Sequence, residues 1–416
     1  MSALSRIAAL AGFAGLALAE EAAPSAEVAA PAAAEVVSNL NTGDTAWMIV
    51  ACALVLFMTL PGLALFYGGL VRAKNVLSVL MACFGCAGLI SVLWAMYGFS
   101  AAFDTTGMAE GQVTLTSFIG GMQYAFLSGV NGGEWGTIPT PVFCLFQLTF
   151  AIITPALIVG AFAERMKFWT MMVFSALWFT VVYLPICHMA WSGPGALFHT
   201  WGVIDFAGGT VVHINAGVAG LVAALVLGKR TGYPQVPMKP HNLVLAAIGA
   251  GMLWIGWFGF NAGSALGANA TAGNALLATH LATAAAVLAW LLCEQIKHGK
   301  PSLLGAISGA VAGLVAITPA ADQAGPMGAL LLGAVSGVAC FWGATSLKKM
   351  CGYDDALDAF GVHGVGGIVG ALLTAVVAAP VLQGAKGADY SIGSQLVAQA
   401  MGVGFSIIWT GVITFV

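Results

Sequence analysis

Long apolar segments, separated by short polar turns, follow one another along most of the chain. Each is close to the roughly 20 residues that an α-helix needs to cross the hydrocarbon core of a bilayer. The segments are 46–70, 76–100, 140–162, 168–188, 206–228, 243–264, 274–293, 302–320, 327–346, 358–380 and 395–416. The pattern therefore predicts an all-α membrane protein with eleven transmembrane helices.

Composition supports a lipid-facing surface. Hydrophobic residues make up 60% of the 416 residues and charged residues only 7%, whereas soluble domains carry about 25% charged residues. A soluble globule of this size could not cover its surface with so few charges, but a surface in contact with lipid needs none. The net charge of -3 comes without a basic tract, and so gives no indication of nucleic-acid binding.

The basic residues predict the orientation of the helices. Arg6 belongs to the N-terminal segment, and Lys386 follows the tenth helix. The remaining basic residues all fall in alternate loops: Arg72, Lys74, Arg165, Lys167, Lys229, Arg230, Lys239, Lys297, Lys300, Lys348 and Lys349. The positive-inside rule makes these loops cytoplasmic. We therefore expect the mature N-terminus outside and the last helix to end inside.

The N-terminal region predicts export. Arg6, the short apolar run 7–18 and the A-x-A site before Glu20 are typical of a signal peptide over residues 1–19. An uncleaved N-terminal helix is the alternative, although the run is short for a bilayer span. Residues 20–44 then form an exported linker before a membrane domain over 45–416. The protein is expected in the cell (inner) membrane. The last helix stops at Val416 without a polar tail, so we expect the sequence to be truncated there.

The eight cysteines show no disulfide framework, because most of them lie in apolar segments where a free cysteine acts as a small hydrophobe. Cys83 and Cys86 have the C-x-x-C spacing of metal or redox motifs. They lie within one predicted helix and have no second pair, so this interpretation is disfavoured. No cofactor or metal site is predicted.

A short internal repeat relates the fifth and tenth helices. His213, Gly217 and Gly220 have the same H-x3-G-x2-G spacing as His363, Gly367 and Gly370. Helices 1–5 and 6–10 are then two five-helix repeats, followed by a final helix. Because five is odd, the repeats are inverted in the membrane, a plan that places transporter sites near the midplane between the halves.

Ionisable residues inside apolar helices usually face a protein interior or a pathway. His213 and His363 are such residues. Each could be a core histidine with one hydrogen bond, but their equivalent repeat positions favour a facing pair of neutral rings. A bridging metal or haem is disfavoured, since no further ligands are present. Asp205 is interpreted as a helix N-cap, as a charge that stabilises a bound cation, or as both. Asp358 is interpreted as the cap of the tenth helix.

Several phrases along the chain resemble the ammonium transporter family (Amt/Mep, with the Rhesus proteins as relatives), most closely its bacterial members. They are Pro61-Gly-Leu-Ala-Leu-Phe-Tyr-Gly-Gly69, Gly160-Ala-Phe-Ala-Glu-Arg165, Asp205-Phe-Ala-Gly-Gly-Thr-Val-Val-His213-Ile-Asn-Ala-Gly217, Lys239-Pro-His-Asn242, Trp254-Ile-Gly-Trp-Phe-Gly-Phe-Asn-Ala-Gly-Ser264, Lys300-Pro-Ser-Leu-Leu-Gly305 and Asp358-Ala-Phe-Gly-Val-His-Gly-Val-Gly-Gly367. The resemblance runs from about Asp44 to the end of the chain. The outer loop 104–139 shows no motif that we can interpret.

The resemblance implies a homotrimer in membrane lipid with one pore in each subunit. It implies substrate binding by Trp191, Phe150, Ser264 and Asp205. Phe150 and Phe260 match a pore gate. His213, His363, Phe146, Trp257 and Tyr183 match pore-lining positions. It also implies ammonium or ammonia as substrate, with methylammonium as a further candidate, and a PII signal protein as a partner through a tail that is missing here.

The expected function is transmembrane ammonium transport and not catalysis. Ammonium is expected to bind at the outer aromatic site and lose its proton, after which ammonia crosses the hydrophobic pore past the twin histidines. Coupled proton transfer along these histidines stays open. The alternatives are an ammonium sensor (transceptor) and a Rhesus-like ammonia or gas channel. A membrane enzyme is disfavoured because the expected lumen has no nucleophile–base pair.

Overall fold

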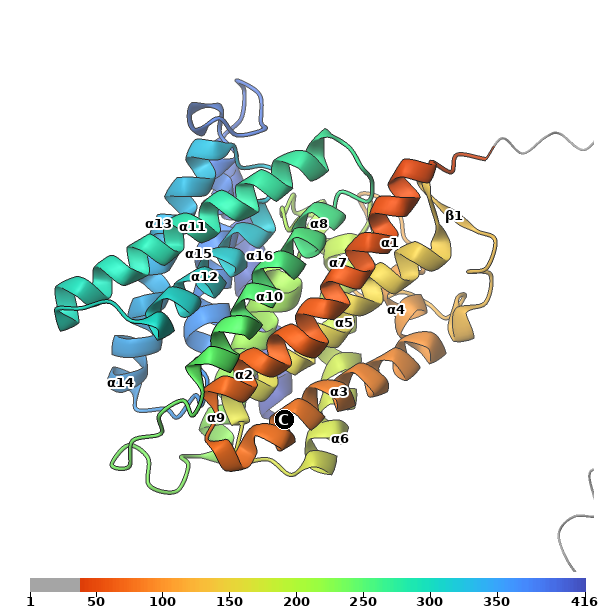
Figure 1. Cartoon of the computed structure of the whole chain (residues 1–416). Coiled ribbons are helices and arrows are strands. Elements are labelled where there is room, and N and C mark those ends of the chain that lie inside the picture. Colours follow the sequence, from red (N-terminus) through yellow and green to blue (C-terminus); the bar gives the residue numbers. More distant parts are fainter. Residues whose placement is uncertain (1–37) are drawn as a thin grey trace, which may run out of the picture. The chain divides into compact units, whose positions relative to one another are not determined.

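The computed structural model describes residues 38–416, and this part of the chain is almost entirely helical (Figure 1). Within it, 11 helical stretches are long and apolar enough to cross a membrane, and they run from Thr42–Leu70 to Ile392–Phe415. The fold class predicted from the sequence is confirmed. The predicted signal peptide 1–19 and most of the linker 20–44 lie outside the described residues.

The α-helices are α1 Thr42–Phe57, α2 Ala64–Leu70, α3 Val76–Leu93, α4 Phe99–Phe103, α5 Thr140–Phe162, α6 Phe168–Trp178, α7 Leu184–Trp191, α8 Leu197–Thr200, α9 Asn215–Leu227, α10 Leu243–Gly263, α11 Ala270–His298, α12 Leu303–Ile317, α13 Pro326–Trp342, α14 Lys348–Cys351, α15 Val365–Val377 and α16 Ile392–Phe415. Short 3₁₀ turns are η2 Ala73–Asn75, η4 Leu115–Ser117, η5 Ala125–Leu127, η8 Thr318–Ala320 and η11 Pro380–Leu382.

Many of the membrane-spanning stretches contain a π-helical turn. These turns are η1 Met58–Leu63, η3 Trp94–Gly98, η6 Phe179–Tyr183, η7 Gly209–Ile214, η9 Gly343–Leu347 and η10 Phe360–Gly364. In η1 the cause is local, because Pro61 has no amide hydrogen to donate within the helix. Such turns are often found at functional sites. His213 lies in η7 and His363 in η10, so the two repeat motifs have the same local conformation.

The loop 104–139 contains the one pair of strands in the described part of the chain, β1 Glu134–Trp135 and β2 Ile138–Pro139. The strands are antiparallel, with Trp135 opposite Ile138. This pairing holds the Trp135 ring flat against Phe143 at the start of α5, with ring centroids 4.1 Å apart. The loop therefore contributes an aromatic side chain to one end of the helix bundle.

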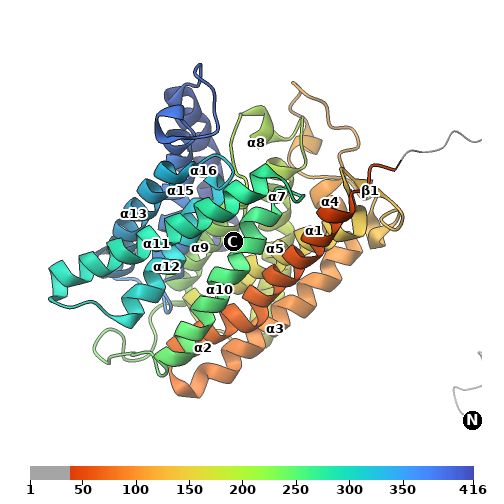
Figure 2. The same cartoon turned by 45° about the horizontal axis from the view of Figure 1, so that its top comes forward.

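Small residues allow the helices to approach each other closely. Helices α1 and α2 pack along α10, and α11 packs against both α12 and α13 (Figure 2). At the first contact, a methyl group on Gly249 would overlap the backbone nitrogen of Phe66, and one on Gly69 would overlap that of Ala246. Glycine at such positions is typical of membrane proteins, where van der Waals contact between backbones drives helix association.

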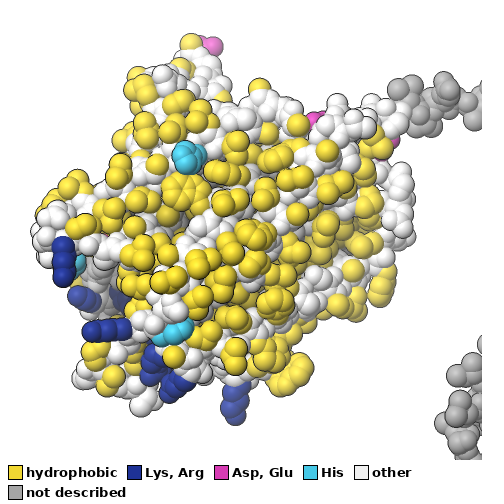
Figure 3. All heavy atoms as spheres, in the orientation of Figure 1, with side chains coloured by type: hydrophobic (Ala, Val, Ile, Leu, Met, Phe, Trp, Pro, Cys, Tyr) yellow, Lys and Arg dark blue, Asp and Glu magenta, His cyan; other side chains and the backbone are white. Residues whose placement is uncertain are grey.

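Apolar and basic side chains occupy different parts of the surface (Figure 3). Large apolar side chains such as Leu77, Trp169 and Ile296 are at least 75% exposed on the helix flanks, as expected for a surface that faces lipid. Lys and Arg side chains gather at one end of the described molecule. We call this the basic end.

A buried ionic network links loops at the basic end. Glu164, which follows α5, pairs with Arg72 after α2 and lies 3.8 Å from Arg230 after α9. Arg230 in turn binds both carboxylate oxygens of Asp354, at 2.7 and 2.9 Å. Burial alone would raise the pKa of the Asp354 carboxyl, but the hydrogen bonds and charge of Arg230 outweigh it and the pKa lies below its ordinary value. The pair therefore stabilises the fold at neutral pH and loses this effect in acid, as the pH falls through the lowered pKa.

We expect Arg230→Ala to destabilise the protein by about 3–5 kcal/mol, because it leaves the carboxylates of Asp354 and Glu164 buried without their shared cation. The measurement is the temperature at which detergent-solubilised protein loses its monodisperse peak in size-exclusion chromatography. Lys349→Ala is the control, since Lys349 is exposed. Equal midpoints for the two variants would contradict a structural role for the network.

Candidate functional site

Two cavities lie along one line of buried side chains. The smaller, of about 130 Å³, is lined by Trp135, Phe143, Gln147, Phe150, Trp191, Phe206, Ser264 and Leu266. We call it the aromatic cavity. The larger, of about 370 Å³, contains Lys348 and Asp358 in its lining and is called the basic-end cavity. Phe150 lines the first cavity and His363 the second.

Aromatic rings close the inner side of the aromatic cavity. Phe150 stacks on Phe260 with ring centroids 4.1 Å apart, and both side chains are almost fully buried. Trp191 stands edge-on to Phe150 at 5.6 Å, and Phe146 contacts the same ring at 5.0 Å. These rings therefore close the cavity on this side with apolar faces and edges.

Asp205 positions Trp191 instead of lining the cavity. The Trp191 indole nitrogen donates to the backbone oxygen of Asp205 at 2.8 Å. The Asp205 carboxylate accepts hydrogen bonds from backbone N–H groups at the start of η7, those of Gly208, Gly209, Thr210 and Val211, and from the Thr210 hydroxyl. This is the helix-capping arrangement considered in the sequence analysis, and it satisfies amides that would otherwise be unpaired.

Ser264 presents an acceptor to the aromatic cavity. It is the C-cap of α10, and its hydroxyl donates to the backbone oxygen of Phe260 at 2.9 Å. A hydroxyl has one hydrogen and two lone pairs. Because the hydrogen is already engaged, the free capacity of Ser264 is to accept a hydrogen bond from whatever occupies the cavity.

The two histidines meet beyond the Phe150–Phe260 pair. Their Nδ1 atoms lie 3.3 Å apart, and the rings are nearly parallel with centroids 5.4 Å apart. Such a contact requires one ring to donate and the other to accept, so the pair shares one proton. Trp257 stacks on His213 at 5.3 Å and is itself fixed by a hydrogen bond to Thr318. The Nε2 atom of His213 is buried and has no hydrogen-bond partner within residues 38–416.

Glycines make the histidine contact possible. A methyl group on Gly217 would overlap the backbone of Gly364, next to His363, and one on Gly367 would lie 3.1 Å from the Cβ atom of His213. The first glycine of each motif thus packs against the histidine region of the other motif, whereas the second glycines, Gly220 and Gly370, pack against Ala161 and Ala316. This reciprocal packing is what the H-x3-G-x2-G repeat predicts.

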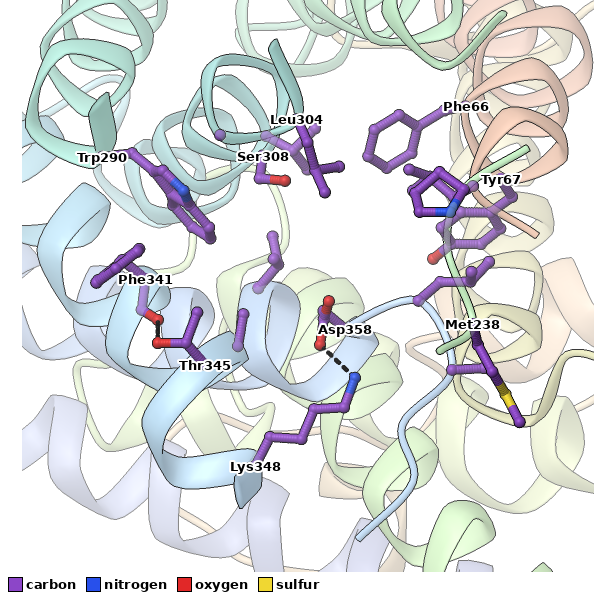
Figure 4. Close-up of a pocket in the computed structure, with 18 of the residues that line it drawn as sticks. Phe66, Tyr67, Met238, Trp290, Leu304, Ser308, Phe341, Thr345, Lys348 and Asp358 are labelled. Atoms are coloured by element: carbon purple, nitrogen blue, oxygen red, sulfur yellow. Dashed lines mark hydrogen bonds and ion pairs between the residues drawn. The ribbon is translucent and has the colours of Figure 1, made fainter. Parts of the chain in front are cut away.

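The basic-end cavity has aromatic walls and one ion pair (Figure 4). Phe66 and Tyr67 face Trp290 and Phe341 across it, and Lys348 donates to Asp358 at 2.8 Å. His363 opens into this space. The cavity was not foreseen from the sequence, in which its lining residues lie in widely separated segments.

The prediction that Asp358 caps the tenth helix is wrong. The amides of Ala359 and Phe360, at the start of η10, donate to the Asp355 carboxylate at 3.0 and 2.7 Å. Burial raises the pKa of Asp355 to about 6, an effect that the charge of Lys348 opposes. Asp358 turns away with a positive φ of 59° and uses its carboxylate to hold Lys348. The reason for the error is that the turn before η10, in which Asp358 has its positive φ, brings the carboxylate of the earlier residue Asp355 to the start of the helix.

Most of the residues predicted for the site come together. Trp191, Phe150, Phe146, Phe260, Trp257, His213 and His363 form one continuous series of contacts, with Ser264 at its aromatic end. Tyr183 is buried in η6, where its ring stacks on Phe179, and it joins this series through no ring contact in the described structure. Sequence reasoning missed Gln147, although a polar side chain inside an apolar helix is a recognisable signal.

The arrangement of the described residues suits passage of a small solute. Within residues 38–416, no group of three His, Cys, Asp or Glu side chains is placed to hold a metal ion. Cys83 and Cys86 are both buried in α3 as free thiols. The aromatic cavity, the stacked rings, the imidazole pair and the basic-end cavity follow one another through contacts between neighbouring side chains.

Known proteins resemble this chain in both sequence and fold. The model of the Ammonium Transporter Family matches residues 46–416. An ammonium transporter from Bacillus subtilis is 45% identical over 91% of each chain, and one from Aquifex aeolicus is 47% identical over 91% of this chain and 87% of its own. The crystal structure of Saccharomyces cerevisiae Mep2 superposes with a TM-score of 0.81, at 33% identity over 92% of this chain and 88% of that one. A structure described as a sensor Amt protein superposes with a TM-score of 0.82, at 28% identity over 90% of this chain and 91% of that one. The chain belongs to the ammonium transporter family.

Proposed function

We propose that this protein carries ammonium-derived nitrogen across the membrane as a transporter and not as an enzyme. The observation that carries the proposal is the buried imidazole pair of His213 and His363, which lies on the series of contacts between the two cavities. The names of the relatives support ammonium as the substrate.

Binding takes place in the aromatic cavity. A partly dehydrated cation is attracted by the faces of Trp191 and Phe150, an effect worth about 0.5–2 kcal/mol for each ring. One hydrogen of ammonium is donated to the free lone pairs of Ser264. Asp205 acts indirectly, because its backbone oxygen orients Trp191 and its carboxylate caps η7. Potassium has the same charge and a similar size but no hydrogen to donate.

Passage requires loss of the proton. The stacked rings of Phe150 and Phe260 close the route and must turn aside for a solute to pass. Beyond them the walls are apolar, and an ion there would lose its hydration without replacement. Ammonium can leave its proton behind and continue as ammonia, which the imidazoles of His213 and His363 can hydrogen-bond. Potassium has no such option. The proton shared by the two rings offers a path for coupled proton transfer.

The basic end faces the cytoplasm in this proposal. Its Lys and Arg residues satisfy the positive-inside rule, and the aromatic cavity then opens toward the outside. The two five-helix repeats are inverted relative to each other about the histidine pair. The protein is proposed to work as a homotrimer in the cell (inner) membrane, with a PII signal protein as a partner that binds through a C-terminal tail.

An ammonium sensor is the second candidate, favoured by the likeness to the sensor Amt structure. A sensor needs the aromatic cavity to bind the ion but does not need nitrogen to pass the histidines. A Rhesus-like gas channel fits less well, because the aromatic cavity with Trp191 is built to attract a cation.

Purified protein in liposomes distinguishes these functions. We expect an ammonium gradient, but not a potassium gradient, to change the internal pH and to drive a current. Trp191→Leu should raise the half-saturating ammonium concentration about tenfold, the loss of about 1.4 kcal/mol of cation–π attraction. Trp254→Leu is the control, since the Trp254 ring packs on His280 outside the route.

Each outcome of this assay has a separate meaning. A pH change without current in the intact protein would exclude the coupled version. If the intact protein binds ammonium but gives neither a pH change nor a current, the sensor function is favoured. Equal half-saturating concentrations for Trp191→Leu and the intact protein would remove Trp191 from the binding site.

A further inference from the structure

Gln147 occupies a distinctive position on α5. Phe143, Gln147 and Phe150 are spaced four and three residues apart, so they lie on one face of the helix. All three line the aromatic cavity. Gln147 is 8% exposed, and the segment around it, 143–150, is otherwise mostly apolar. A primary amide is therefore placed beside the rings that are proposed to attract the cation.

The amide oxygen of Gln147 lacks a protein partner. Its Oε1 atom is buried and accepts no hydrogen bond from any part of residues 38–416. Buried side-chain acceptors are nearly always paired, because an unpaired one loses its hydrogen bonds to water without replacement. The amide can exchange its oxygen and nitrogen by a half-turn about its last torsion, so the oxygen is able to face the cavity.

A glutamine with a purely structural role has different surroundings in this protein. Gln399 on α16 is also buried, but both ends of its amide are engaged. Its nitrogen donates to the backbone oxygens of Ile204 and Ala371, and its oxygen accepts from the Ile204 amide. Gln147 has no comparable set of contacts, so packing alone does not explain why an amide stands at this position.

We propose that Gln147 determines specificity by accepting a hydrogen bond from ammonium, in addition to the one accepted by Ser264. This inference rests on the proposed function. Trp191 donates to Asp205, and Ser264 donates to Phe260, so neither offers a free donor to a solute in the cavity. The Gln147 amide and the Ser264 hydroxyl are the side-chain acceptors in the cavity lining.

Two uncharged acceptors suit this substrate. Ammonium and methylammonium have hydrogens to donate, whereas potassium and caesium have none, so a pair of acceptors favours the first two over the alkali ions. A carboxylate at the same place would also bind ammonium, but it would hold the charged form and oppose release of the proton. A neutral amide binds the ion and still allows it to leave as ammonia.

The test compares Gln147→Leu and Gln147→Glu with the intact protein in liposomes that contain a pH-sensitive dye. Leucine removes the acceptor, whereas glutamate keeps it. We expect Gln147→Leu to raise the half-saturating ammonium concentration about tenfold, as for a lost hydrogen bond to a charged group. Gln147→Glu should keep the half-saturating concentration at or below that of the intact protein.

The inference fails if Gln147→Leu stays within about twofold of the intact protein in half-saturation, or if Gln147→Glu weakens binding as much as leucine does. A lower melting temperature with unchanged half-saturation would assign Gln147 a structural role and also overturn it. If the intact protein itself gives no ammonium-dependent pH change, the proposed function fails instead. The two failures are thus distinguishable.

Discussion

His213→Leu is expected to reduce ammonium-driven transport at least about 100-fold. Leucine has a similar volume but offers no hydrogen bond, so ammonia loses a polar partner in a passage whose other walls are apolar, and His363 loses the ring that shares its proton. Transfer of an unpaired polar group into an apolar environment costs several kcal/mol, and about 3 kcal/mol of added barrier corresponds to a rate about 100-fold lower.

The measurement is the initial rate of internal pH change in liposomes after an ammonium jump, normalised to the amount of monodisperse protein. His280→Leu is the matched control, because His280 is exposed on α11 and packs only on Trp254 and Phe258 among the described rings. A His213→Leu rate close to that of this control would mean that nitrogen does not pass the imidazole pair.

Gly217→Leu is expected to prevent formation of a stable membrane domain. Even one added carbon would overlap the backbone nitrogen and Cα atom of Gly364, and backbone atoms cannot turn aside as a flexible side chain does. Overpacking commonly costs about 1–3 kcal/mol, and we expect at least the upper value here because α9 and η10 must separate. The separation would also part His213 from His363.

Yield of monodisperse protein and its thermal midpoint in detergent provide the measurement. Gly251→Leu on α10 is the control, since a side chain there meets nothing within 4 Å. It is expected to behave as the unmodified protein. If Gly217→Leu were as stable as this control, the close approach of the two histidine helices would not be needed for the fold.

The structure also explains which of the site residues were predictable. His213 and His363 stand out in the sequence because ionisable groups are rare inside apolar helices. The other predicted residues rested on resemblance, since an aromatic ring in such a helix has no pattern that separates a cavity wall from ordinary packing. Trp135 could not be predicted, because it reaches the aromatic cavity through a strand pair in a loop.

The helical membrane fold was determined by the sequence alone, because a bilayer requires each spanning segment to satisfy its own backbone and to be apolar throughout. These requirements apply to each segment separately, so the length and composition of a segment are enough to reveal it. The two cavities, the capping role of Asp355 and the unpaired amide of Gln147 were decided only by the tertiary structure. They depend on which faces of distant helices meet, and that is set by close packing between residues far apart in the chain.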